Sequence, residues 1–212
     1  MNTGTFRPGG GAVRRLLRLP PALAALALLI SPAARAEQGA VEVVRQYQAA
    51  LIAAMKQGGG YDGRFKSLQQ PVAKAFDLGF IAQRSAGPAW GTFTEPQKKR
   101  YVEAFSRYSV SQHAARFKNF GGERFEVLGT DDVGRGFVRV RTVIVTGGGE
   151  RVALDYLLGQ RAGGWRIVDV FAKGTISEVA TRRADFASVI RDQGAEGLIR
   201  ELDAKAAAAR SS

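Results

Sequence analysis

The chain has 212 residues, no cysteine and a formal net charge of +12 at neutral pH. This length suits one domain with a sizeable core, and the lack of cysteine excludes a disulfide framework, a thiolate nucleophile and a cysteine-based metal or iron–sulfur site. Basic runs interleaved with aromatic residues are missing, which argues against nucleic acid, so the charge points to anionic lipid headgroups, to an acidic partner or simply to a solvated surface.

The first segment has the pattern of a secretory signal peptide. Arg14, Arg15 and Arg18 precede a short apolar run from Leu19 to Ile30, and an A-x-A cleavage site follows at Ala34–Ala36. The run is shorter than the roughly 20 residues that span a bilayer, which favours secretion over a membrane anchor. We therefore expect residues 1–36 to be removed and residues 37–212 to form one domain in the periplasm. The removed segment contains five arginines and no acidic residue, so the formal net charge of the mature chain falls from +12 to +7.

Helical patterns occupy the first part of the mature chain. Apolar residues recur at helical spacing from Val41 to Lys56, and again from Tyr61 to Phe76, where Pro71 predicts a break. Asp77 then suits the N-cap of a short helix.

The longest predicted helix runs from Thr94 to Phe117. Thr94 and Gln97 form a capping box at its start. Phe105 and Tyr108 stand near one face of this helix. An aromatic stripe of this kind is usually core, and here we expect it to be both core and the wall of a ligand cavity.

Four β-rich runs follow with short turns between them, which predicts an antiparallel meander. Thr175 and Glu178 form a second capping box, which starts the closing helices. Helices, then strands, then helices predict an α+β domain: a curved sheet of four strands, with room for a fifth, and helices covering one face, as in a cystatin-like or NTF2-like cone. The strands are expected at Phe125–Leu128, Gly136–Val145, Val152–Gln160 and Trp165–Phe171, and the closing helices near Ile176–Arg191 and Ala195–Ala209.

His113 is the only histidine in the chain. It lies near the end of the long predicted helix, where a protonated imidazole suits the helix dipole, so we expect a surface or helix-end residue. No second histidine or cysteine is present to complete a metal site. The chain also lacks a phosphate loop and a dinucleotide fingerprint, and no cofactor is expected.

Two carboxylates, Asp155 and Asp169, fall on neighbouring predicted strands. Paired carboxylates can perform acid–base catalysis. However, Arg139, Arg141 and Arg166 belong to the same sheet, so cross-strand ion pairs are the expected explanation of both side chains.

Three patches of the sequence carry a family resemblance. They are Tyr156, Gly164-Trp165-Arg166-Ile167-Val168-Asp169-Val170, Gly174 and Arg183-x-x-Phe186 in the first, Phe76, Asp77, Arg84, Gly87 and Trp90 in the second, and Gln97, Arg100, Phe105 and Ala114-x-Arg116-Phe117 in the third. These patches resemble the MlaC/toluene-tolerance proteins, a family of periplasmic phospholipid-binding proteins that serve an ABC transport system. Within this family, the segment from Asp155 to Phe186 is most similar to the hopanoid-associated HpnM branch, and Thr175-Ile176-Ser177, one residue longer than the usual spacing, favours that branch.

The resemblance implies a carrier without catalytic activity. It would bind a phospholipid or hopanoid between the sheet and the helices and move it between the inner and outer membranes. Its partners would be the lipid and inner-membrane ABC-type or RND-type transport components, with transient membrane contact. The side chains expected to line the cavity are Phe105, Tyr108 and Phe117 from the long helix and Val138, Val140, Ile144, Leu154, Tyr156 and Leu158 from the sheet.

Two other functions stay open at this point. Cone-shaped α+β domains also host enzymes, and here Asp155, Asp169 or His113 would supply the acid and base. A structural adaptor of a membrane transport complex is the other possibility, and a fully packed interior would be its sign. Polar residues that converge inside the cavity would favour the enzyme.

Overall fold

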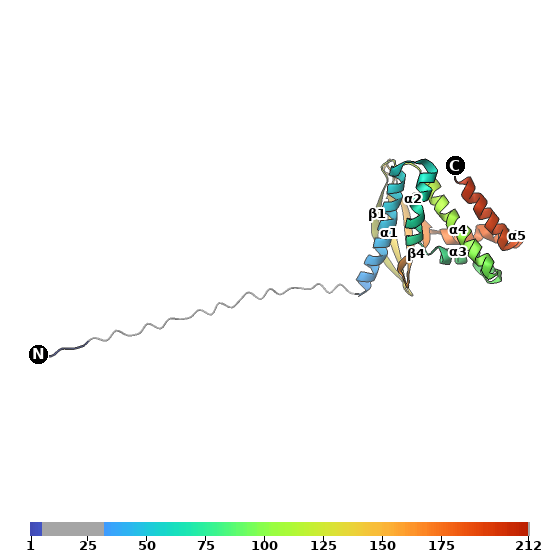
Figure 1. The fold of residues 1–212 in the computed structure, drawn as a ribbon. Helices are drawn as coiled ribbons and strands as arrows, with labels where there is room; N and C mark the ends of the chain where they lie inside the picture. Colours follow the sequence, from blue (N-terminus) through green and yellow to red (C-terminus); the bar gives the residue numbers. More distant parts are fainter. Residues whose placement is uncertain (6–31, 212) are drawn as a thin grey trace. The chain divides into compact units, whose positions relative to one another are not determined.

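The computed structural model describes residues 1–5 and 32–211 (Figure 1). The chain divides into two units, Met1–Ile30 and Ser31–Ser212. Residues 1–5 carry no helix or strand. The arginines and the apolar run of the expected signal peptide lie outside the described residues. Within the described residues, no helix combines the length and apolar character needed to cross a membrane.

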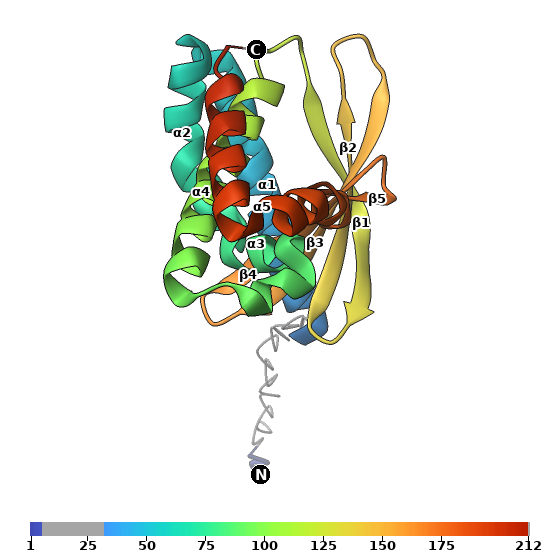
Figure 2. The same ribbon diagram turned by 90° about the vertical axis from the view of Figure 1, so that its right-hand side faces the viewer.

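The second unit has the expected α+β fold, with five helices and one antiparallel sheet among its described residues. Figure 2 shows the helices gathered on one side of the strands. The helices are α1 (Pro32–Gln57), α2 (Gly60–Ala75), α3 (Leu78–Ala86), α4 (Glu95–Arg116) and α5 (Glu178–Ala208), with a 3₁₀ helix, η1, at Gly87–Thr92.

Local side-chain chemistry explains where α3 and α4 begin. The Asp77 carboxylate accepts a hydrogen bond from the Phe80 N–H at 3.0 Å and caps α3. Thr94 and Gln97 make the reciprocal hydrogen bonds of a capping box at the start of α4. Both expected caps are confirmed. The expected break at Pro71 is wrong: α2 continues to Ala75, because the loss of one backbone donor is outweighed by the burial of its apolar face.

The sheet has five strands in the order in which they occur along the chain, so the expected meander is confirmed. The first strand extends well beyond the predicted Phe125–Leu128. The sequence did not indicate this extension, because two β-bulges, between Val127 and Gly129 and between Asp132 and Gly134, interrupt the apolar–polar alternation that marks a strand. The strands are β1 (Arg124–Gly134), β2 (Phe137–Val145), β3 (Arg151–Arg161), β4 (Gly164–Ala172) and the short β5 (Ile176–Ser177).

Helix α5 begins later than expected and contains a break. Its N-cap is Ser177, whose hydroxyl accepts from the Ala180 N–H at 3.0 Å. The expected capping box at Thr175 is wrong, because the Thr175 N–H closes a turn onto the Ala172 carbonyl at 3.2 Å. Gly194 (φ 64°, ψ −166°) interrupts the helix in a conformation that favours glycine, at the position where two separate helices were expected.

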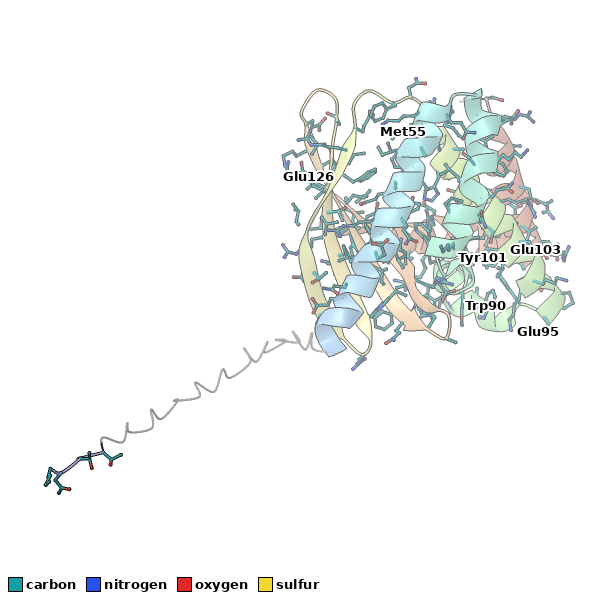
Figure 3. All side chains as sticks on the ribbon, turned by 60° about the vertical axis from the view of Figure 1, so that its left-hand side comes forward. Met55, Trp90, Glu95, Tyr101, Glu103 and Glu126 are labelled. Carbon is teal, nitrogen blue, oxygen red and sulfur yellow. The ribbon has the colours of Figure 1, made fainter. Side chains whose placement is uncertain are left out.

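The main core lies between the helices and one face of the sheet. Leu51 of α1, Phe105 of α4 and Leu158 of β3 are all fully buried there. The opposite face of the sheet carries charged side chains: Glu126 lies on its outer side in Figure 3 and pairs with Arg151 at 2.8 Å. A sheet covered on one face explains the apolar–polar alternation of its strands.

Candidate functional site

A pocket lies where the helical layer meets the middle of the sheet. Its volume is about 130 Å³, and it is open to solvent on one side. Leu154 and Tyr156 of β3 and Val170 of β4 form the sheet wall, and Tyr108 and Phe117 of α4 face them. The sheet residues are brought together because β3 and β4 are neighbours in the sheet. The end of α4 reaches the strands, where the ring of Phe117, the C-cap residue of α4, lies 6.5 Å from that of Phe125 in β1.

Two buried aromatic rings close the inner end of the pocket. Tyr47 of α1 and Phe76, at the end of α2, line it, and their rings meet edge to face with centroids 4.9 Å apart. Such a contact is favourable beyond the area it buries. This part of the lining is therefore mainly aromatic.

Charged side chains gather at the open side. Glu178, at the start of α5, lies 3.6 Å from a guanidinium nitrogen of Arg182 and 3.9 Å from one of Arg116. Both distances exceed the roughly 2.7–2.9 Å of a strong charge-assisted hydrogen bond. The two arginines therefore keep donors for a further anionic group.

His113 lies in the last turn of α4, as expected, but it is partly buried and lines the pocket instead of facing only solvent. Its ring is flanked by those of Tyr47 and Phe76, at centroid distances of 5.7 and 5.6 Å. Nδ1 lies 2.6 Å from the Ser109 carbonyl oxygen, so this nitrogen is assigned the proton. The pKa of His113 is lowered to about 4, chiefly by burial and also by the nearby Arg182 and Arg116, against the raising effect of the Ser109 bond.

This depressed pKa predicts acid sensitivity. The folded protein favours the neutral form of His113. The stability that depends on this neutral ring is fully present above the ordinary histidine pKa of about 6.5 and is lost as the pH falls towards 4. Between pH 7 and 4.5 the wild type should lose about 2 kcal/mol more unfolding free energy than His113→Gln, measured by urea denaturation. Parallel losses in the two proteins would contradict the assignment.

The two strand carboxylates do not form an acid–base pair. Asp155 lies opposite Phe171 and Asp169 opposite Leu157. The buried Asp155 accepts from the Thr142 N–H at 3.2 Å. Asp169, at the edge of the pocket, accepts from the Ser177 hydroxyl at 2.6 Å and from the Val179 N–H at 3.1 Å. Asp169 therefore ties the start of α5 to β4.

The expected ion pairs of these carboxylates with the sheet arginines are wrong. The Arg139 guanidinium lies over the Phe171 ring at 4.1 Å, Arg141 pairs with Asp131 at 2.9 Å, and Arg166 donates to the Gly163 carbonyl at 3.3 Å. Within residues 1–5 and 32–211, no group of histidine and carboxylate side chains is placed to hold a metal ion.

Comparison with known proteins identifies the family. A family model described as "MlaC protein" matches residues 45–204, which is most of the chain. The chain belongs to the MlaC family. A search of curated proteins found no match. Among solved structures, the phospholipid-binding protein from Ralstonia solanacearum, in complex with a phospholipid, is similar with a TM-score of 0.70 and 23% sequence identity, over 82% of this chain and 98% of that chain.

In this MlaC-family chain, the nine side chains expected at the cavity fall into two groups. Tyr108, Phe117, Leu154 and Tyr156 line the pocket. The other five do not line it. Four of these, Phe105, Val138, Val140 and Leu158, are buried in the core, and Ile144 is half-buried near the end of β2.

The pocket also takes residues that sequence reasoning missed. Glu178, Val179 and Arg182 of α5 line it, as do Tyr47 and Phe76. Tyr47 was visible as part of an apolar helical face, but nothing in the local pattern distinguished a pocket wall from core. The α5 residues carried no signal, because their place depends on how α5 leaves the sheet.

Proposed function

We propose that this MlaC-family protein is a periplasmic lipid carrier. The observation that supports it most is a pocket between sheet and helices, with both apolar and charged walls, in a fold whose solved relative is described as phospholipid-binding and in complex with a phospholipid. The task of such a carrier is desolvation: each methylene removed from water is worth about 0.8 kcal/mol, so a sixteen-carbon chain gains on the order of 10 kcal/mol from a protein cavity. Binding and release at equilibrium suffice, without covalent chemistry.

Loading requires the pocket to widen. Its volume of about 130 Å³ lies below the roughly 300–1,000 Å³ typical of small-molecule sites. Tyr108, Phe117, Leu154 and Tyr156 would contact the chain first. As the helices move away from the sheet, Phe105, Val138, Val140, Ile144 and Leu158 would extend the cavity.

The arginines at the open side suit a phosphate-bearing headgroup. Arg116 is largely exposed, whereas the Arg182 side chain is only 19% exposed, and Glu178 contacts both loosely. A phosphate placed between the two guanidinium groups would replace the carboxylate as their partner. The apolar part of the lipid would then extend inward to the rings of Tyr47 and Phe76.

For the lipid itself, we propose either a phospholipid or a hopanoid. The segment that resembles the hopanoid-associated HpnM branch, from Asp155 to Phe186, contains β4, β5 and the start of α5, and these elements supply several pocket residues. The proposed partners are inner-membrane ABC-type or RND-type components, with transient membrane contact. The MlaC-family match favours neither alternative function. Of the three residues considered for acid–base catalysis, Asp155 does not line the pocket, and Asp169 is engaged with the Ser177 hydroxyl and the Val179 N–H. The pocket also leaves the interior less than fully packed, unlike that of a purely structural adaptor.

Export is the basis of the proposed location. Thr130 of β1 donates to the Glu37 carboxylate at 2.7 Å, and Ala40 is the first buried residue described in α1. Cleavage after Ala36 would therefore leave this packing in place. N-terminal sequencing of the periplasmic protein is expected to begin at Glu37, and recovery of the chain from Met1 in the inner membrane would contradict export.

Native mass spectrometry of the protein purified from the periplasm tests the carrier function. We expect a mass above that of the polypeptide by one lipid, and extraction should identify it as a phospholipid or a hopanoid. A carrier should also accept lipid from vesicles that contain anionic phospholipid. Bare polypeptide in both experiments would reject the proposed function.

A further inference from the structure

Two hydroxyl groups in the pocket have no hydrogen-bond partner. Ser109 of α4 and Tyr156 of β3 both line the pocket and are 3% and 1% exposed. Neither the Ser109 Oγ nor the Tyr156 hydroxyl meets a partner at hydrogen-bond distance. Buried polar groups are normally satisfied, because leaving one unpaired costs free energy.

Two neighbouring serines of α4 make a hydrogen bond to the helix backbone that Ser109 lacks. Ser106 donates to the Val102 carbonyl and Ser111 to the Tyr108 carbonyl, each at 2.7 Å. This return to the helix backbone is the usual way to satisfy a serine within a helix. The Ser109 Oγ makes no such bond, so a residue that lines the pocket keeps an unused donor and unused lone pairs.

The Gln48 amide lies close enough to the Tyr156 hydroxyl to favour its ionised form, but no hydrogen bond of ordinary geometry joins the two groups. The Gln48 Nε2 instead donates to the Thr142 Oγ1 at 3.3 Å, so the Tyr156 hydroxyl stays available to a stronger partner. Desolvation by burial raises the pKa of Tyr156, so the phenol keeps its proton and can donate. Because Nδ1 of His113 is committed to the Ser109 carbonyl, the Nε2 of that ring carries a lone pair at the same pocket.

We propose that the pocket selects a lipid whose buried part carries a hydrogen-bonding oxygen, which the Ser109 and Tyr156 hydroxyls bind. The inference rests on the proposed carrier function and deepens it, because a purely hydrocarbon chain would leave both hydroxyls unpaired. Two sources supply this chemistry: the ester carbonyl of a glycerophospholipid and the hydroxyl of a polycyclic lipid alcohol.

Matched lipid pairs distinguish the two sources. One pair is dioleoyl phosphatidylglycerol and its ether-linked analogue, which lacks the carbonyl oxygens. The other is the hopanoid alcohol diplopterol and the hydrocarbon diploptene. Vesicles containing equal amounts of both members of a pair are incubated with the protein, and native mass spectrometry measures the ratio bound.

The wild type should prefer the oxygen-bearing member of at least one pair by about 3- to 10-fold, the effect of one or two net hydrogen bonds. Ser109→Ala and Tyr156→Phe should each reduce this preference, and the double variant should bring the ratio close to one. The bond from His113 is retained in Ser109→Ala, because its acceptor is the backbone carbonyl.

Ser85→Ala is the matched control. The Ser85 Oγ is also fully buried without a partner, but Ser85 does not line the pocket. It should melt at or above the wild-type temperature and keep the lipid preference. The single variants each remove one unpaired hydroxyl and should also stay folded, and the bound ratio is measured on folded protein.

The outcomes separate this inference from the proposed function. Binding of both members of each pair in equal amounts by the wild type overturns the inference and leaves the carrier function standing. An unchanged preference in the double variant also overturns it. Failure of the wild type to bind any of the four lipids overturns both.

Discussion

Leu154→Glu is expected to give folded protein that carries no lipid. Leu154 is half-buried at the pocket wall, so a glutamate there can be hydrated through the open side, at a cost of roughly 1–2 kcal/mol. The same charge opposes burial of an apolar chain, so lipid binding should be lost. Thermal melts combined with native mass spectrometry measure both effects, and Tyr108→Glu on the facing helix should behave in the same way.

Leu158→Glu is the control on the same strand. Leu158 is fully buried and does not line the pocket, so its charge would have neither water nor a partner. Such burial costs several kcal/mol, against a total stability of about 5–15 kcal/mol for a typical domain, and should unfold much of the protein. If Leu154→Glu unfolds as readily as Leu158→Glu, the pocket is ordinary core and the carrier function is wrong.

Asp169→Ala should destabilise the protein by about 2–4 kcal/mol. Its carboxylate accepts from the Ser177 hydroxyl and from the N–H groups of Val170 and Val179, so one side chain joins β4 to the first turn of α5. Hydrogen bonds to a charged acceptor are among the stronger ones, and the alanine variant leaves these donors to find water. Urea denaturation measures the loss.

Asp185→Ala is the matched substitution at the same pocket. Asp185 lines the open side and is exposed, and an exposed carboxylate of this kind contributes within about 0.5 kcal/mol. Lipid binding should weaken in Asp169→Ala as well, since the first turn of α5 carries Glu178 and Arg182. Equal stability of the two variants would show that the contacts of Asp169 do not hold α5 in place.

The sequence by itself determined the elements whose signals are local. The capping box at Thr94, the N-cap at Asp77 and the alternation along β2, β3 and β4 each depend on residues a few positions apart. Their periodicity therefore predicted an antiparallel meander beside helices. The motif from Tyr156 to Phe186 indicated the MlaC family, and the family match over residues 45–204 confirmed it.

Only the tertiary structure decided which apolar residues meet the pocket. Leu154 and Leu158 lie on the same strand and belong to the same apolar pattern, yet one lines the pocket and the other is core. The difference arises from which elements cover each part of the strand, and this arrangement is set by contacts between segments far apart in the chain. Val140 and Phe105 were expected in the pocket and lie in the core for the same reason.

The surroundings of the polar side chains in the pocket could be predicted from the sequence least of all. The sequence correctly predicted that His113 lies at a helix end, but not that its ring lies between those of Tyr47 in α1 and Phe76 at the end of α2. Ser109 is one of several serines in α4, and only the fold leaves its hydroxyl unpaired at the pocket. Sequence periodicity reports which face of an element is buried, whereas the pairing of a buried polar atom depends on the three-dimensional positions of its neighbours.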